Sequence, residues 1–156
     1  MIKLIEIKDL PQSCTGAPTP FVISNEHDVK VVYILANRNN DEDDMDEFAV
    51  ITFDSFNQFK FGQPNDEVID GHPFAKYGLS AYSFYEVENS PWIEELRIMN
   101  SVHHRHSDKL FEGLKHIIAT FHDRTFEIVC EKYTFNIFKN CTFNKIVNIS
   151  AQELLY

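Results

Sequence analysis

Glycine is scarce in this chain, with five residues in 156. Neither a GxGxxG pattern nor a Walker A pattern occurs, so the sequence offers no glycine-rich loop that would cradle a phosphate. The scarcity also argues against a glycine-punctuated repeat array. A length of 156 residues fits one domain, and we expect a single domain spanning residues 1–156.

The sequence also contains few cysteines and no long apolar run. The three cysteines, Cys14, Cys130 and Cys141, are odd in number and match no zinc or redox spacing. We therefore expect reduced thiols and a cytoplasmic protein. No apolar run approaches the roughly 18 residues of a membrane span. The start, Met1–Lys8, alternates charged and apolar residues, which is not the pattern of a signal peptide.

Positive charge is the third deficit. Lys and Arg number 14 against 24 Asp and Glu, giving a net charge of −10. Nucleic-acid binders carry a clustered basic face, and no stretch here is rich in Lys or Arg, so nucleic acid is not an expected ligand. An acidic surface attracts cationic partners, so a basic protein is the candidate partner that this charge allows. The same charge also serves solubility alone.

Aromatic residues, by contrast, are abundant: 14 Phe, six Tyr and one Trp can fill a core. Alternating or β-branched stretches predict a series of strands, mostly in consecutive hairpins. Two turns are expected, at Asp54-Ser55 and at Asp123-Arg124. The predicted strands cover residues 2–7, 29–36, 48–53, 56–61, 81–88, 115–122, 125–131 and 143–149, with a frayed helical tail at 151–156.

One helix is predicted from Pro91 to about Val102. Ser90 is a helix N-cap type and Pro91 is favourable at the first helical position. Trp92, Leu96 and Met99 follow the helical period and should face the sheet. The fold class is therefore α+β, a largely antiparallel, curved sheet packed on one main helix at about residues 91–102.

The hairpin of residues 115–122 and 125–131 has a consistent two-residue pattern. If Phe121 faces Phe126, the core side receives Ile117, Ala119 and Phe121. His116, Ile118, Thr120 and His122 then lie on the outer face. This register places His116 beside Glu131, so that His116–Glu131 or His122–Asp123 could form histidine–carboxylate pairs.

Six of the seven histidines lie between Gly71 and Glu131. Histidine titrates near neutral pH and can bind metals or transfer protons. His103, His104 and His106 follow the predicted helix, but no HExxH pattern occurs, and Arg105 among them opposes a bound cation. We predict no metal and no cofactor, and a solvated helix end at these histidines.

The most favourable place for a pocket is the junction between the irregular connection Gln63–Ser80 and the segment Glu86–Trp92, because long loops beside a rigid strand end carry functional groups. Glu86 and Glu88, two residues apart, could divide acid and base roles as in glycoside cleavage. The alternative is an exposed turn at His72 and a solvated Glu88. The candidate pocket residues are His72, Tyr77, Glu86, Glu88, Asn89 and His103.

The block Gly71-His72-Pro73, Tyr85–Ile93, Asn100–His103 and His116–Glu127 resembles the core of a small uncharacterised bacterial domain family. The resemblance implies no catalytic residue. Two functions are then open. The first is a non-enzymatic interaction protein, of the immunity or inhibitor kind that caps a basic partner. The second is a metal-dependent or acid/base hydrolase that uses the His/Glu cluster in residues 71–131, for which no GxSxG nucleophile pattern is present.

Overall fold

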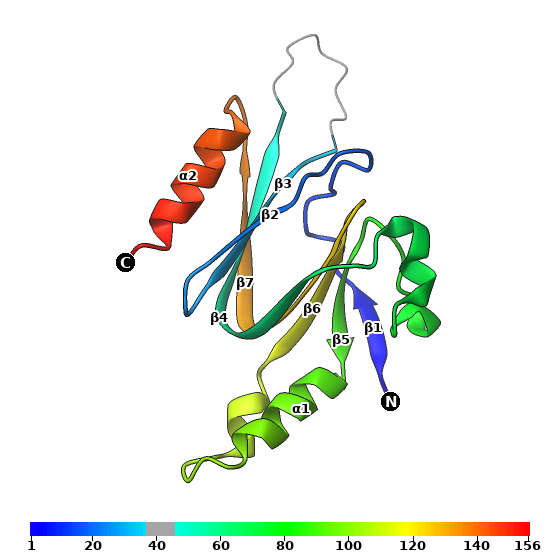
Figure 1. Ribbon diagram of the computed structural model, residues 1–156, viewed down its shortest axis with the longest axis vertical. Helices are drawn as coiled ribbons and strands as arrows, with labels where there is room; N and C mark the ends of the chain where they lie inside the picture. Colours follow the sequence, from blue (N-terminus) through cyan, green and yellow to red (C-terminus); the bar gives the residue numbers. More distant parts are fainter. Residues whose placement is uncertain (37–45) are drawn as a thin grey trace.

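The computed structural model describes residues 1–36 and 46–156, and seven of its segments form one antiparallel sheet (Figure 1). The order across the sheet is β1-β5-β6-β7-β4-β3-β2. The strands are β1 (Lys3–Glu6), β2 (Phe21–Ser24), β3 (Val29–Ile34), β4 (Phe48–Gly62), β5 (Phe84–Glu88), β6 (Lys115–Thr120) and β7 (Thr125–Phe138). The predicted α+β class with an antiparallel curved sheet is confirmed.

The helical segments lie around this sheet. The α-helices are α1 (Pro91–Asn100) and α2 (Phe143–Glu153), and the short 3-10 segments are η1 (Asp66–Gly71), η2 (Ala75–Tyr77) and η3 (Asp108–Phe111). Figure 1 shows α1 at one end of the sheet and α2 beside β2 to β4. The two helices therefore cover different parts of the sheet, where the sequence predicted one main helix.

The strand β4 corrects the hairpin predicted across Asp54-Ser55. It runs without a turn for 15 residues and pairs with β7 along its whole length. Ser55 adopts a left-handed φ of 52°, and the register shifts between Phe56 and Gln58, which marks a β-bulge. Asp54-Ser55 therefore lies within a continuous strand. The local irregularity beside it bends the strand instead of reversing it.

The β6–β7 hairpin is tight, as predicted, but its register differs by two residues. The N–H of Phe121 donates to the carbonyl of Arg124 at 2.9 Å, so the turn centres on His122 and Asp123. Ala119, not Phe121, lies opposite Phe126. A shift of two keeps every side chain on its predicted face. Ile117, Ala119 and Phe121 are accordingly buried.

The main core lies on one face of the curved sheet and is formed chiefly by β3, β4, β6 and β7. Its most buried large side chains include Tyr33, Phe53, Phe121 and Phe126. The ring centroids lie 5.4 Å apart in both Tyr33–Phe121 and Phe53–Phe126. Aromatic pairs at such distances stabilise a core beyond their buried area.

Three smaller hydrophobic clusters pack the helical segments against the sheet. The segments η1 and η2 bury Ile69 and Phe74 against Ile118, and α1 with η3 buries Trp92, Leu96 and Phe111 against Val129. The helix α2 buries Ile146 against β3 and β4. The outer face of β6, predicted as a simple outer surface, is therefore covered by chain from residues 69–79. This cover brings His72 to the sheet.

Two helix boundaries differ from the predictions. The helix α1 begins at Pro91 with Ser90 as its N-cap, as predicted, but ends at Asn100, before Val102. Met99 is 60% exposed, not packed on the sheet, because η3 and β7 contact only the side that carries Trp92 and Leu96. Residues 143–149, predicted as a strand, form the first part of α2, where the Thr142 hydroxyl accepts from the N–H of Lys145.

Candidate functional site

Four polar side chains from four separate elements meet beneath the start of α1. His116 comes from β6, Glu127 from β7, His72 from the end of η1, and Ser90 from the N-cap of α1. His72, Ser90 and His116 are buried, and the side chain of Glu127 is 12% exposed. We name this set the Ser90–His72 chain, which comprises Ser90, His116, Glu127 and His72.

The carboxylate of Glu127 joins the two histidines. Its Oε1 lies 2.8 Å from Nε2 of His72, and its Oε2 lies 2.8 Å from Nε2 of His116. On the far side of the first ring, Nδ1 of His72 accepts the N–H of Phe74 at 3.1 Å. A nitrogen that accepts carries no proton, so His72 is neutral and donates to Glu127 through its Nε2–H.

The second histidine continues the chain to a hydroxyl. Nδ1 of His116 lies 2.7 Å from Oγ of Ser90, and that Oγ also accepts the N–H of Ile93 at 3.3 Å. In the neutral tautomer that donates Nε2–H to the carboxylate, His116 receives the hydroxyl hydrogen of Ser90 on Nδ1. In that tautomer every hydrogen of the Ser90–His72 chain points toward Glu127.

Glu127 supplies the negative charge of the chain. Burial raises the pKa of this carboxyl, but the hydrogen bonds from His116 and His72 outweigh burial and lower the pKa to about 2. The group is ionised at neutral pH. Across the part of the chain that the structure describes, no buried side-chain nitrogen or oxygen lacks a hydrogen-bond partner. The carboxylate is thus fully compensated within the fold.

Aromatic rings enclose the Ser90–His72 chain. Trp92 and Phe74 meet the ring of His116 edge-on, with centroids 5.1 and 5.6 Å away. The indole N–H of Trp92 donates to Gln58 at 3.1 Å, and the ammonium of Lys60 lies 4.0 Å from the Trp92 ring. These contacts exclude water from His116, and hydrogen bonds strengthen in such surroundings.

An open cavity of about 620 Å³ lies at the junction between β5 and α1. Its rim carries four carboxylates and its wall is partly apolar. Ser90 belongs both to this wall and to the buried chain, so the two features meet at that residue. The lining residues are Glu86, Val87, Glu88, Asn89, Ser90, Ile93, Glu94, Phe111, Glu112 and Leu114.

Two of the rim carboxylates are already paired with cations. Lys115 Nζ lies 3.1 Å from Glu86, and Arg97 Nε lies 2.8 Å from Glu94. Within residues 1–36 and 46–156, Glu88 and Glu112 form no ion pair with a Lys, Arg or His side chain. Both are exposed, so their charges face the solvent at the cavity mouth.

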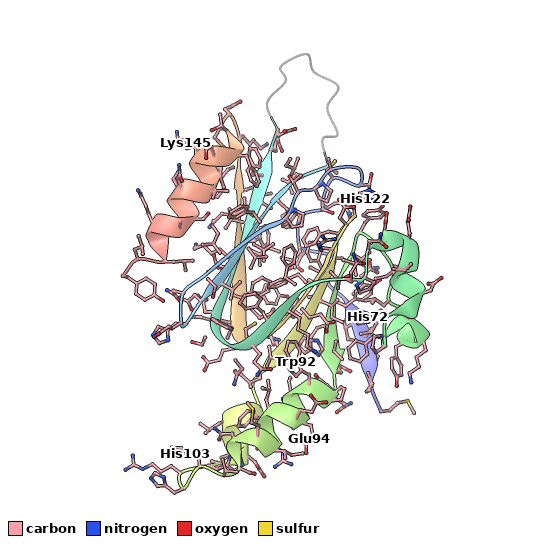
Figure 2. The ribbon with its side chains drawn as sticks, in the orientation of Figure 1. His72, Trp92, Glu94, His103, His122 and Lys145 are labelled. Atoms are coloured by element: carbon pink, nitrogen blue, oxygen red, sulfur yellow. The ribbon has the colours of Figure 1, made fainter. Side chains whose placement is uncertain are left out.

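The structure divides the six residues predicted for the pocket. It brings Glu86, Glu88 and Asn89 together in the cavity. His72 points inward to Glu127, so it is not the exposed turn residue of the alternative prediction. Tyr77 packs its ring 6.2 Å from Phe74. His103 lies at the far end of α1, away from His72 (Figure 2).

The histidines after α1 lie at a solvent-exposed helix end. His103 and His104 are exposed and stack with centroids 4.6 Å apart. His106 lies 2.8 Å from both Asp108 and Asn100. Among the described residues, no three His, Cys, Asp or Glu side chains are placed to hold a metal ion together.

A second, more exposed cluster joins Asp66, Tyr82 and His122. Nδ1 of His122 lies 2.8 Å from Asp66, and the Tyr82 hydroxyl donates to the same carboxylate oxygen. The hydrogen bond from Tyr82 lowers the pKa of Asp66, and the same bond raises that of Tyr82. His122 thus takes Asp66 as its near partner, while Asp123 lies 3.9 Å away.

Sequence reasoning missed Glu127 as the partner of His116. The predicted register placed His116 opposite Glu131, whereas the observed register moves the partner strand by two residues. It also assigned Ser90 to helix capping alone. The outer-face position of His116, with Glu127 on the facing strand, was the one local signal for this pair.

No protein-family model, no curated protein and no solved structure matches this chain. The resemblance of residues 71–127 to a bacterial domain family therefore stays a prediction. The helices in the described part of the chain include none that is long and apolar enough to cross a membrane.

Proposed function

We propose that this protein is an interaction domain that binds a cationic group of a basic partner protein in the cavity between β5 and α1. The observation that carries the proposal is the composition of that cavity, in which four glutamates surround a partly apolar wall. Its volume of about 620 Å³ falls within the usual range of ligand pockets. It suits one or two side chains of a partner.

A lysine or arginine side chain matches both parts of this cavity. Its aliphatic stem packs on apolar residues while its charged end remains near the rim. Ile93, Phe111 and Leu114 provide the apolar surface, and Glu88 and Glu112 provide carboxylates not engaged by Lys115 or Arg97. The net charge of −10 steers a basic partner toward the protein.

An inhibitor or immunity protein that caps a basic toxin or nuclease is the concrete form of this function. Such a protein needs a charged, preformed recognition surface and no catalytic group. A cytoplasmic setting accompanies the proposal and is supported by the three cysteines, which are all free thiols in the structure.

Binding is tested with a capped triarginine peptide as the probe and a capped triglutamate peptide as its charge control. Titration followed by NMR should shift the backbone amides of Ser90, Ile93 and Leu114, which line the cavity. The double variant Glu88→Gln/Glu112→Gln should weaken binding by about tenfold or more, because two charge-assisted contacts are lost.

Glu95→Gln is the matched control, since Glu95 is exposed on the same helix and does not line the cavity. It should bind triarginine like the natural protein, and added salt should weaken binding in both. Shifts scattered over the surface, or equal losses in the control and the double variant, would contradict a specific cationic site.

A further inference from the structure

We propose that Ser90 is a nucleophile, activated by His116 and Glu127, that accepts an acyl group from an ester substrate. This inference goes beyond the binding proposed above and needs none of the four rim glutamates. It rests on the Ser90–His72 chain and on the place of Ser90 in the cavity wall.

The distances within the chain meet the requirement for a serine activated by a general base. The base must lie within hydrogen-bond reach of the hydroxyl and must itself be oriented by a third group. Oγ of Ser90 lies 2.7 Å from Nδ1 of His116, and Nε2 of His116 lies 2.8 Å from Glu127. The ionised carboxylate fixes the tautomer in which Nδ1 is free to accept a proton.

A capping role alone does not account for this arrangement. A helix cap needs only an oxygen that accepts an N–H, and Thr142 caps α2 in that way. At α1 the capping hydroxyl is also hydrogen-bonded to the buried imidazole of His116, which is linked through the carboxylate of Glu127 to His72. Burying these groups costs desolvation energy that an apolar cluster would avoid. Activation of the Ser90 hydroxyl explains why the fold keeps these polar groups despite that cost.

The surroundings of Ser90 provide space for a substrate and a donor for the reaction. Ser90 lines the cavity beside Ile93, Phe111 and Leu114, whose apolar side chains suit an acyl chain. Pro91 has no N–H, so the amide of Trp92 is the first in α1, and first-turn amides have no partner within their helix. The proposal assigns this N–H, a first-turn donor of α1, to the developing oxyanion.

In the reaction, Oγ of Ser90 forms a bond to the ester carbonyl carbon while its proton passes to Nδ1 of His116. Glu127 stabilises the resulting imidazolium through Nε2–H. The tetrahedral intermediate then breaks the bond to the leaving alcohol, which takes the proton from Nδ1. Water, deprotonated by the same nitrogen, cleaves the acyl-serine and restores the free hydroxyl.

The test is covalent labelling of the natural protein with a fluorophosphonate, followed by intact mass and peptide mapping. The expected result is one adduct per chain, located on Ser90 and absent when the protein is labelled in denaturant. This measurement needs no variant that might fail to fold. An absence of adduct on the folded protein, or adducts on other residues, would overturn the proposal.

Variants then separate activation from structure. Glu127→Gln should slow labelling at Ser90 by about 10²-fold or more, because the base loses its orienting charge. Ser101→Ala, at an exposed serine at the other end of α1, should label like the natural protein. Equal labelling rates for Glu127→Gln and the natural protein would refute activation by His116.

Triarginine binding and labelling of Ser90 are separate measurements on the natural protein, so either proposal can fail without the other. Failure of peptide binding with Ser90 labelling retained would reject only the proposed binding function.

Discussion

Oε2 of Glu127 lies 2.8 Å from Nε2 of His116, although the two residues are not opposite each other on their strands. In the β6–β7 ladder, Glu127 faces Ile118 and His116 faces Val129, so the pair is diagonal. Diagonal neighbours on one sheet face lie within reach of long side chains. The tight turn at His122-Asp123 sets this register and thereby selects Glu127 as the partner of His116.

The first prediction concerns acid stability. The carboxyl of Glu127 has its pKa lowered from 4.5 to about 2, so its contribution is complete above about pH 4.5 and is lost as the pH falls toward 2. That lowering corresponds to about 3 kcal/mol. Urea unfolding should show that the natural protein has a higher free energy of unfolding than Glu127→Gln at pH 7. This difference should disappear as the pH falls to 2.5.

Glu95→Gln serves as the comparison, because Glu95 is exposed on α1. Its unfolding free energy should run parallel to that of the natural protein across the same pH range. If the unfolding free energy of Glu127→Gln also runs parallel to that of the natural protein, the two histidines do not hold Glu127 as an ionised carboxylate.

The second prediction separates the two sides of α1. Trp92 is 6% exposed and Met99 is 60% exposed. Trp92→Ala should lower the unfolding free energy by about 3–5 kcal/mol, because a large buried ring is removed. Met99→Ala should change it by less than about 0.5 kcal/mol. Chemical denaturation of both variants checks the pair, and similar losses would place Met99 in the core.

The third prediction concerns the backbone of β4 at Ser55, next to the bulge. Ser55 has a φ of 52°, a conformation that costs an ordinary residue about 1–2 kcal/mol. Ser55→Gly should therefore stabilise the protein by about 0.5 kcal/mol after the entropy cost of glycine is counted. Thr134→Gly, at an exposed position of β7, should instead destabilise it. Destabilisation by both, measured by thermal unfolding, would contradict the left-handed conformation of Ser55.

The fourth prediction concerns the thiols. Burial raises the pKa of Cys130 to about 12, whereas Cys14 and Cys141 are partly exposed. At pH 8 a disulfide reagent such as Ellman's should react with two thiols in the folded protein and with the third only on unfolding. Three fast reactions would show that Cys130 is accessible and that the β6–β7 core is open.

The sequence predicted those elements whose signals lie within one contiguous stretch. The start of α1 follows from Ser90 and Pro91, and the faces of β6 and β7 follow from their alternation. The single strand β4 could not be predicted, because Asp54-Ser55 has turn-forming residues and it is pairing with β7 that continues the strand through them. Residues 143–149 were mistaken for a strand because their β-branched content outweighed the Thr142 cap.

The site was predictable only in part, for a related reason. Glu86, Glu88 and Asn89 share a cavity because they are adjacent in sequence. His72 and Ser90 meet Glu127 and His116 through folding of distant segments, and no local pattern encodes that contact. A register error of two residues left the sheet faces correct but assigned His116 the wrong carboxylate.

The central claim is the directed hydrogen-bond chain from Ser90 to Glu127, and the protonation of its two histidines tests it most directly. Two-bond nitrogen–proton NMR correlation at pH 7 reports which ring nitrogen carries the proton. We expect His72 and His116 both to be neutral with the proton on Nε2, because Nδ1 of each accepts a hydrogen bond. A proton on Nδ1 of His116, or a fully protonated ring at this pH, would contradict the chain and the activation of Ser90.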